Sequence, residues 1–412
     1  MLSIAGQGVE RKRVALAFAA YFLLLSSYYV LRPVRDDMAV QFGASRLQWL
    51  FSGTFLFTLG MVPLIGLAVR RLPRVWLLPT VYGFLIANLA GFALVFLLVP
   101  GRPAAAAFFI WLSVFNLLVV SLFWSGCSDA FSTEESHRSY GHIAAGGTAG
   151  ALAGPALTAL LARHVHTSQL LLVSIILLLA ATLCMAALRS ASASRAAPGA
   201  PAPARIGGSV LAGIPLALRR PQLRRMMLLI VSYTTVSTLL YIELVDLAGK
   251  RYADSGERKA FFATLDLVVN GLALALQLLG TRRLVQHAGL RVALSLAPLV
   301  IGAGLLALGA WRSAIAVAAL QVLHRAGEFA IAKPGREMVY TTVDAESRYK
   351  AKNFIDTAVY RASDAASGWL IAAVRTGGAD PMLAVGLPVA AVWLWVAYSL
   401  GRNHDSLTHE QA

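Results

Sequence analysis

The sequence predicts an all-α membrane protein that crosses the bilayer about twelve times. Of its 412 residues, 58% are hydrophobic and only 14% are charged, whereas a soluble domain is normally about one quarter charged. The apolar residues form runs of the roughly 20 residues that a helix needs to cross the hydrocarbon core. These runs lack the alternation of a strand. Because backbone groups in lipid must find partners within a helix or a closed barrel, spanning helices are expected.

Twelve segments are predicted to span the membrane, in two sets of six that form two pseudo-repeats. The first set comprises residues 14–31, 48–69, 75–99, 104–126, 141–161 and 168–188. The second set comprises residues 226–247, 261–280, 290–311, 313–332, 354–374 and 381–400. We therefore expect an N-terminal six-helix bundle over 1–188 and a C-terminal six-helix bundle over 226–412. Two parallel repeats are a known design of membrane transporters.

The segment between the two sets, 189–225, is predicted to be a basic, flexible linker on the cytoplasmic side. Residues 189–208 are rich in Ala, Ser, Pro and Gly, and several arginines follow. The first composition is typical of flexible chains. Placing both termini in the cytoplasm also puts more Lys and Arg into the inner loops, as the positive-inside rule requires.

The formal net charge of +16 does not indicate nucleic-acid binding. The positive residues are spread over short loops between apolar spans rather than gathered on one soluble face, so the lipid bilayer is the expected partner. Cys127 and Cys184 lie in or beside apolar stretches and are interpreted as small packing residues. Neither the cysteines nor the scattered histidines show metal-ligand spacing, and no metal is expected.

Ionisable residues inside the predicted spans carry the strongest functional signal. Each costs about 2.5–3.5 kcal/mol at the membrane centre and usually faces a cavity or a partner. They occur in or at the ends of the first, eighth, tenth and eleventh spans. The residues are Arg32, Arg35, Asp266, His324, Arg325, Glu328, Asp356, Arg361 and Asp364.

Polar residues form a stripe along the eleventh span, because they recur at helical spacing. The stripe contains Thr357, Arg361, Asp364 and Gly368. It lines water or a substrate, or it belongs to an internal network in which Arg325 pairs with Glu328 and Arg361 with Asp364. Asp266 has no charged neighbour at helical spacing, and it takes up a coupling proton or caps a neighbouring helix.

The two halves show a weak internal repeat. A Glu-Ser pair at 135–136 matches one at 346–347, an offset of 211 residues (346 minus 135). The offset aligns two cations at the end of the first span with two anions at the end of the seventh: Arg32 with Glu243, and Arg35 with Asp246. The match is due to chance, or these residues form ion pairs that close the outer mouth in one conformation.

The fifth span carries Gly146, Gly150 and Gly154 at four-residue intervals, with Gly147 beside them. Small residues at this spacing allow two helices to approach closely, so close packing is the expected role.

Three stretches carry motifs of one known family. They are YYVLRPVRDD at 28–37; DAF at 129–131 followed by EESHR at 134–138; and KPGREMVY at 333–340 followed by KAKNFID at 350–356 and Arg361. They resemble the bacterial and plastid nucleotide translocases, the ATP:ADP antiporters, which are distantly related to the major facilitator group. The resemblance implies a major-facilitator-like fold and residence in a bacterial inner membrane.

In that family, basic residues of such motifs help to hold nucleotide phosphates. The positions carried over are Arg35, Arg336, Lys350 and Lys352. Arginine offers phosphate a planar fork and lysine a point charge, while Tyr28 and Tyr29 can stack on a base. The sequence departs from the family pattern at Pro33, which stands in place of an acid, and at Arg35 and Arg336, which replace lysines. Fold therefore transfers more safely than substrate.

The leading hypothesis is a monomeric secondary transporter that works by alternating access on an organic anion such as a nucleotide, in ATP/ADP-type exchange. The alternatives are a proton-coupled carrier of another solute and a non-transporting sensor or scaffold. Without a phosphate-binding loop or a nucleophile arrangement, neither an enzyme nor a cofactor is expected. The candidate substrate-binding residues are Tyr28, Tyr29, Arg32, Arg35, Arg325, Arg336, Lys350, Lys352 and Arg361. The candidate gating or coupling residues are Glu243, Asp246, Asp266, Glu328, Asp356 and Asp364.

Overall fold

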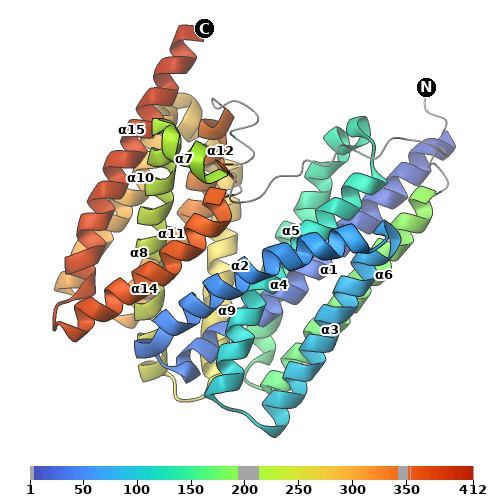
Figure 1. Cartoon of the computed structure of the whole chain (residues 1–412), viewed down its shortest axis with the longest axis horizontal. Coiled ribbons are helices and arrows are strands. Elements are labelled where there is room, and N and C mark those ends of the chain that lie inside the picture. Colours follow the sequence, from blue (N-terminus) through green and yellow to red (C-terminus); the bar gives the residue numbers. More distant parts are fainter. Residues whose placement is uncertain (1–3, 194–212, 342–350, 353, 412) are drawn as a thin grey trace. The chain divides into compact units, whose positions relative to one another are not determined.

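Each predicted span is helical in the computed structural model, which describes residues 4–193, 213–341, 351–352 and 354–411. The first six are α1 (Ile4–Phe42), α2 (Leu47–Arg71), α3 (Arg74–Leu98), α4 (Arg102–Ala130), α5 (Thr133–Leu161) and α6 (Thr167–Ala193) (Figure 1). A short helix η1 (Ala44–Arg46) precedes α2. No strand occurs in the described ranges.

The second half begins with the short helix α7 (Gly213–Arg219) and contains four π-helical turns. Its spans are α8 (Pro221–Arg251); α9 (Ser255–Leu276) with η3 (Gln277–Thr281); α10 (Arg282–Ala310); α11 (Ala314–Gly327) with η4 (Glu328–Ala332) and α12 (Lys333–Thr341); η5 (Ile355–Val359) with α14 (Tyr360–Thr376); and η6 (Met382–Gly386) with α15 (Leu387–Gln411). Residues 194–212 of the predicted linker lie outside the described residues, whereas 213–219 and 221–225 are helical.

Within the described part of the chain, ten helices are long and apolar enough to cross a membrane. The two predicted spans outside this set are α2 and the η5–α14 segment. Arg361 and Asp364 lower the hydropathy of α14, because charged side chains are costly in lipid. The all-α, polytopic membrane fold that the sequence predicts is confirmed.

Helix α1 continues well beyond the predicted end of its span at Leu31 and reaches Phe42, with Pro33 inside it. Val34, Met38 and Ala39 are buried along this extension. Apolar burial of this kind offsets the backbone hydrogen bond that proline removes. As a result, Arg32 and Arg35 lie inside the helix rather than at its end.

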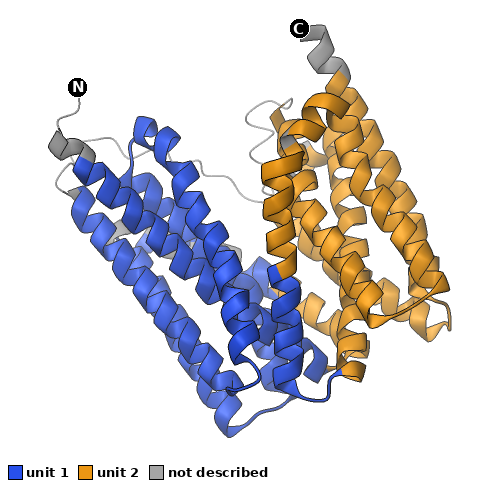
Figure 2. Ribbon diagram, turned by 180° about the vertical axis from the view of Figure 1, so that it is seen from behind, with its two compact units in different colours: residues 1–42, 57–204, 252–267 blue, residues 43–56, 205–251, 268–412 orange. Residues whose placement is uncertain are grey.

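The contacts within the chain define two compact units (Figure 2). Unit 1 contains residues 1–42, 57–204 and 252–267, and unit 2 contains residues 43–56, 205–251 and 268–412. The division falls inside α2 and α9, so each of these helices contributes residues to both units.

The same helix pairs recur in the two halves. In unit 1, α1 packs against α4, α5 and α6, and α3 packs against α6. In unit 2, α8 packs against α11, α14 and α15, and α10 packs against α15. In both halves, therefore, the first span contacts the fourth, fifth and sixth, and the third contacts the sixth. This correspondence confirms the predicted pseudo-repeat.

A buried arginine fixes α1 to the start of α5. Arg13 is only 2% exposed, donates to the carbonyl of Ala130 at 2.8 Å and pairs with Glu135 at 2.5 Å. Glu135 also forms a capping box with Ser132, in which each accepts a hydrogen bond from the other's backbone N–H. This cap explains why α5 begins at Thr133, eight residues before the predicted boundary at 141.

The glycines of α5 pack directly on α1, as their spacing predicts. A Cβ atom added at Gly146 would lie 2.5 Å from the carbonyl oxygen of Phe18, and one at Gly154 would lie 2.7 Å from that of Ser26. A Cβ at Gly150 would meet the carbonyl oxygen of Phe22. Because these neighbours are backbone atoms, they cannot rotate out of the way.

The turn before α9 is held by Asp254. Its carboxylate accepts a hydrogen bond from the backbone N–H of Glu257 at 2.9 Å, which is the geometry of a helix N-cap. This hydrogen bond is the main reason why the pKa of Asp254 lies below its ordinary value.

Candidate functional site

A π-helical turn interrupts the tenth span in the middle of its charged segment. At η4 the backbone N–H of Lys333 bonds to the carbonyl of Glu328, five residues earlier. Pro334 follows directly and has no N–H to donate. Single π-helical turns inside α-helices are frequent at functional sites. This turn separates the apolar α11 from the basic motif at 333–340.

An ion pair spans this turn. The Arg336 guanidinium lies 2.7 Å from the Glu328 carboxylate, and the two side chains are 11% and 7% exposed. The structure thus gives Glu328 a different partner from Arg325, which the internal-network hypothesis assigned to it. Among the described residues, the second oxygen of Glu328 and the Nη1 atom of Arg336 have no hydrogen-bond partner. Buried charged atoms in that condition need an explanation, and a functional role supplies one.

Two aromatic rings enclose His324 beside this pair. The imidazole stacks on the ring of Tyr233 from α8, with centroids 4.7 Å apart, and meets Trp393 from α15 edge-on at 5.6 Å. His324 is 1% exposed, and neither ring nitrogen has a hydrogen-bond partner in the described chain. We call Tyr233, His324, Glu328 and Arg336 the buried charge cluster. Tyr233 was not among the predicted candidates, although its Ser-Tyr-Thr-Thr setting in an apolar span was a usable signal.

The polar stripe of α14 divides into two parts. Arg361 pairs with Asp364 at 3.4 Å, as the network hypothesis proposed, and both side chains are partly exposed. Asp364 also accepts a hydrogen bond from Thr238 of α8 at 3.1 Å. In contrast, Ser367 is buried against Thr235 of α8 at 2.8 Å. Both parts of the stripe therefore contact α8, and the charged part stays partly exposed.

The basic motifs around residues 333–356 come together in unit 2. Lys352 pairs with Glu337 at 2.5 Å and lies 5.6 Å from the ring of Tyr340. Asp356 lies in η5, just after this motif, and is exposed. Lys350 lies outside the described residues.

The candidates of the first span lie in unit 1. The Nε atom of Arg32 is 3.6 Å from Asp266 of α9, and the guanidinium of Arg32 lies 5.8 Å from the ring of Tyr29. Tyr28 and Tyr29 contact each other edge to face, with centroids 5.2 Å apart. Arg35 pairs with Asp36 at 2.8 Å.

The structure gives other partners to the residues that the repeat aligned. Glu243 pairs with Arg375 and lies 3.7 Å from Arg312, and Asp246 pairs with Lys250 at 2.6 Å. Arg32 lies 3.6 Å from Asp266 within unit 1. The partners of Glu243 lie on other segments of unit 2, whereas Lys250 lies one turn from Asp246 on the same helix α8. The pairing of Arg32 with Glu243 and of Arg35 with Asp246 stays a prediction.

Sequence analysis missed the ion pair that joins the ends of α1 and α9. Asp37 is 0% exposed; it pairs with Arg258 at 2.5 Å and accepts a hydrogen bond from Ser255 at 2.5 Å. Arg258 also donates to the backbone carbonyls of Tyr252 and Ala253. Arg258 was interpreted as a loop charge, because no sequence pattern connects it to a residue more than 200 positions away.

The two halves have matching helix contacts and carry charged side chains inside their spans. These features define a polytopic membrane protein built from two structural repeats. The sequence of residues 17–343 matches the Major Facilitator Superfamily, and the chain belongs to this family. The match concerns the superfamily, so the closer resemblance to nucleotide translocases remains a prediction. No curated protein matches the chain in sequence.

Solved structures of Major Facilitator proteins share this fold. The nucleoside transporter NupG is 13% identical, with 97% of this chain and 99% of that chain covered and a TM-score of 0.64. The POT family transporter PepTSo is 12% identical, with 97% and 99% covered and a TM-score of 0.64. The human organic anion transporter MFSD10 is 17% identical, with 96% and 99% covered and a TM-score of 0.57. At these identities the likeness concerns the fold alone.

Proposed function

We propose that this protein is a secondary transporter that carries an organic anion across a bacterial inner membrane by alternating access. The observation that supports the proposal most directly is the buried Glu328–Arg336 pair beside the π-turn of a membrane span. Such a buried ionisable pair is costly in lipid and marks a functional site by default. An anionic substrate can replace Glu328 as the partner of the Arg336 fork, which suits carboxylate and phosphate equally well.

A nucleotide is the first substrate class to test. The proposal rests on the resemblance of the motifs at 28–37 and 333–356 to those of nucleotide translocases. It is supported by the aromatic setting of the buried charge cluster, since His324, one helical turn from Glu328, contacts the rings of Tyr233 and Trp393 and aromatic surfaces bind planar rings. In this proposal the chain is a monomer with both termini in the cytoplasm, and it catalyses no chemical reaction.

The second candidate function is proton-coupled transport of another solute. Asp266 is completely buried inside α9, with Arg32 at 3.6 Å. A buried carboxylate inside a membrane span of a transporter is a typical proton carrier. No feature of the described residues favours a sensor or scaffold over these two candidates.

The proposed function is tested by thermal stability measurements on the purified protein with ATP, ADP, AMP, other organic anions and neutral nucleosides. A ligand that binds the folded state at 100 times its dissociation constant stabilises it by about 2.7 kcal/mol. We expect an organic anion to raise the melting temperature of the wild type and of the Arg283→Gln control, an exposed arginine on α10, but not of Arg336→Gln. Stabilisation by neutral solutes alone would contradict the proposal.

The Asp37–Arg258 pair is expected to control the transport cycle. The pair fixes the beginning of α9 to the end of α1 within unit 1, so we expect this part of α9 to move together with α1. Breaking a buried pair costs about 3–5 kcal/mol, so Asp37→Asn and Arg258→Gln should each slow anion exchange in proteoliposomes by tenfold or more.

The control is a double-mutant cycle on the transport rate. We expect the double variant Asp37→Asn/Arg258→Gln to transport no worse than either single variant. If the double variant instead loses transport rate by the product of the two single losses, the two residues act independently and the prediction is wrong.

A further inference from the structure

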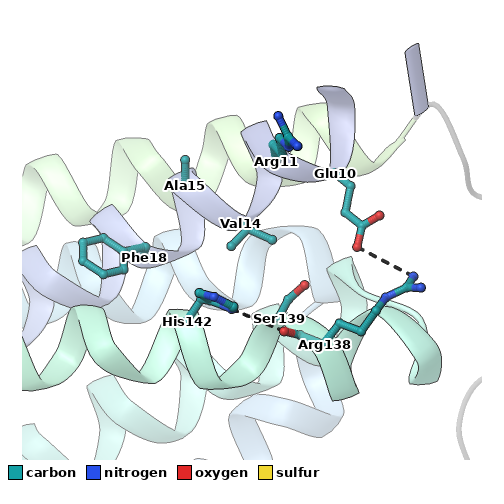
Figure 3. A pocket seen from close by; sticks show the side chains of 8 residues that line it. All are labelled: Glu10, Arg11, Val14, Ala15, Phe18, Arg138, Ser139 and His142. Carbon is teal, nitrogen blue, oxygen red and sulfur yellow. Dashed lines mark hydrogen bonds and ion pairs between the residues drawn. The ribbon is translucent and has the colours of Figure 1, made fainter. Parts of the chain in front are cut away.

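A groove lies between α1 and the beginning of α5, at the N-terminal end of both helices (Figure 3). Its volume is about 780 Å³, which is within the range of small-molecule sites. Its lining residues all belong to unit 1: Glu10, Arg11, Val14, Ala15, Phe18, Arg138, Ser139 and His142. None of the groove residues belongs to the buried charge cluster, and the proposed function does not use them.

The groove combines cations with an apolar surface. Arg11 and Arg138 supply two positive charges against the single negative charge of Glu10, and His142 adds a further polar ring. Val14, Ala15 and Phe18 form the apolar part, and Phe18 is 38% exposed. This pairing of guanidinium groups with an apolar wall is complementary to an anion that carries an apolar or aromatic body.

The cations of the groove are available to a ligand. The closest approach of Arg138 to Glu10 is 3.8 Å (Figure 3), which is longer than a hydrogen bond. An exposed pair at this distance contributes little stability, so a phosphate or carboxylate can displace Glu10 at little cost. Within the described residues, Arg11 forms no ion pair.

The walls of the groove are rigid. Arg13 joins α1 to α5 on the buried side of α1, through Ala130 and Glu135. One turn below the groove, Gly146 brings the backbone of α5 against Phe18. A site on two helices held in this way keeps its shape before a ligand arrives, which lowers the entropic cost of binding.

The groove is closed toward the middle of the span by the packing of α5 on α1. Residues at alternating intervals of four and three lie on the same side of a helix. On α1 the positions in this register are Arg11, Ala15, Phe18, Phe22, Leu25, Tyr29 and Arg32, and none of them is buried. On the opposite side of α1, Ala17, Leu24 and Leu31 are fully buried. Phe18, Phe22 and Tyr29 of the less buried face lie against Gly146, Gly150 and Gly154 of α5, so close helix packing ends the groove below Phe18.

We propose that this groove is a second binding site for the transported organic anion, and that it selects anions with an apolar or aromatic body. The inference rests on the proposed function. Arg138 holds the anionic group in place of Glu10, Arg11 adds positive charge at the mouth of the groove, and Phe18 and Val14 contact the body. An anionic phospholipid offers the same phosphate chemistry, and the experiment below separates the two sources.

The test measures protection of a cysteine placed in the groove. Ala15→Cys is made in a chain that carries Cys127→Ala and Cys184→Ala, and Ala187→Cys on the exposed face of α6 is the matched control. The rate of labelling with neutral N-ethylmaleimide is measured with ADP, phenyl phosphate, inorganic phosphate or phosphatidylglycerol micelles. The melting temperature of each variant verifies that it is folded.

We expect ADP and phenyl phosphate to slow labelling of the Ala15→Cys variant at least fivefold, and inorganic phosphate less than twofold, with no change in the control. Adding Arg138→Gln should raise the concentration needed for protection about tenfold. If ADP stabilises the protein thermally but protects nothing, the groove proposal fails and the proposed function stands. Protection by phosphatidylglycerol alone also overturns it. If no organic anion stabilises or protects, both proposals fail together.

Discussion

Arg336→Gln is expected to abolish anion binding and to lower the free energy of unfolding by about 3–5 kcal/mol, the usual cost of breaking a buried ion pair. The substitution leaves the Glu328 carboxylate, which is 7% exposed, without its counter-ion. It also removes the fork that we propose for the anion. Chemical denaturation in detergent measures the first effect, and ligand-dependent thermal stability measures the second.

Two further variants separate stability from binding. Glu328→Gln/Arg336→Gln removes both charges, so it should recover most of the lost stability while still failing to bind the anion. Arg336→Lys keeps the charge but loses the planar fork, and it should bind more weakly. Recovery of anion binding in the doubly neutral variant would show that Arg336 has only a structural role.

Gly150→Val is expected to prevent stable packing of α1 on α5. The new Cβ would overlap the carbonyl oxygen and carbon of Phe22 and approach the backbone nitrogen of Ser26. Overpacking usually costs about 1–3 kcal/mol when side chains can adjust, and here the neighbours are backbone atoms. We therefore expect a loss at or above the upper end of that range, measured as the melting temperature and the yield of monodisperse protein.

The matched control is Gly83→Ala on α3, where a Cβ meets nothing within 4 Å. Alanine is about 1 kcal/mol more favourable than glycine in a helix interior, so this variant should be at least as stable as the wild type. If Gly150→Val has the same melting temperature as the wild type, α1 and α5 can separate locally without loss of the fold.

The arrangement of spans was predictable from the sequence because burial in lipid and in the protein both demand apolar residues. The helix ends were less predictable. The extension of α1 from Leu31 to Phe42 depends on packing of Val34 and Met38, and η4 depends on local backbone geometry around Pro334. Neither property leaves a hydropathy signal.

The candidate site was predictable in its residue types but not in its pairings. Glu328, Arg336 and Asp266 stood out because each is an ionisable residue in or beside an apolar run. Their partners follow from which helices lie side by side, and that information is not contained in spacing along one helix. For the same reason nothing in the sequence indicated that Asp37 and Arg258 form a buried pair.

Helices α2 and α9 each change from one compact unit to the other along their length. Unit 1 therefore lacks residues 252–267 until the ribosome has passed the middle of α9, although all its other helices are complete by Ala193. Separately produced fragments cut between α6 and α8 would each carry a segment that belongs to the other's core. Such fragments should assemble only when they are synthesised together, and neither should fold alone.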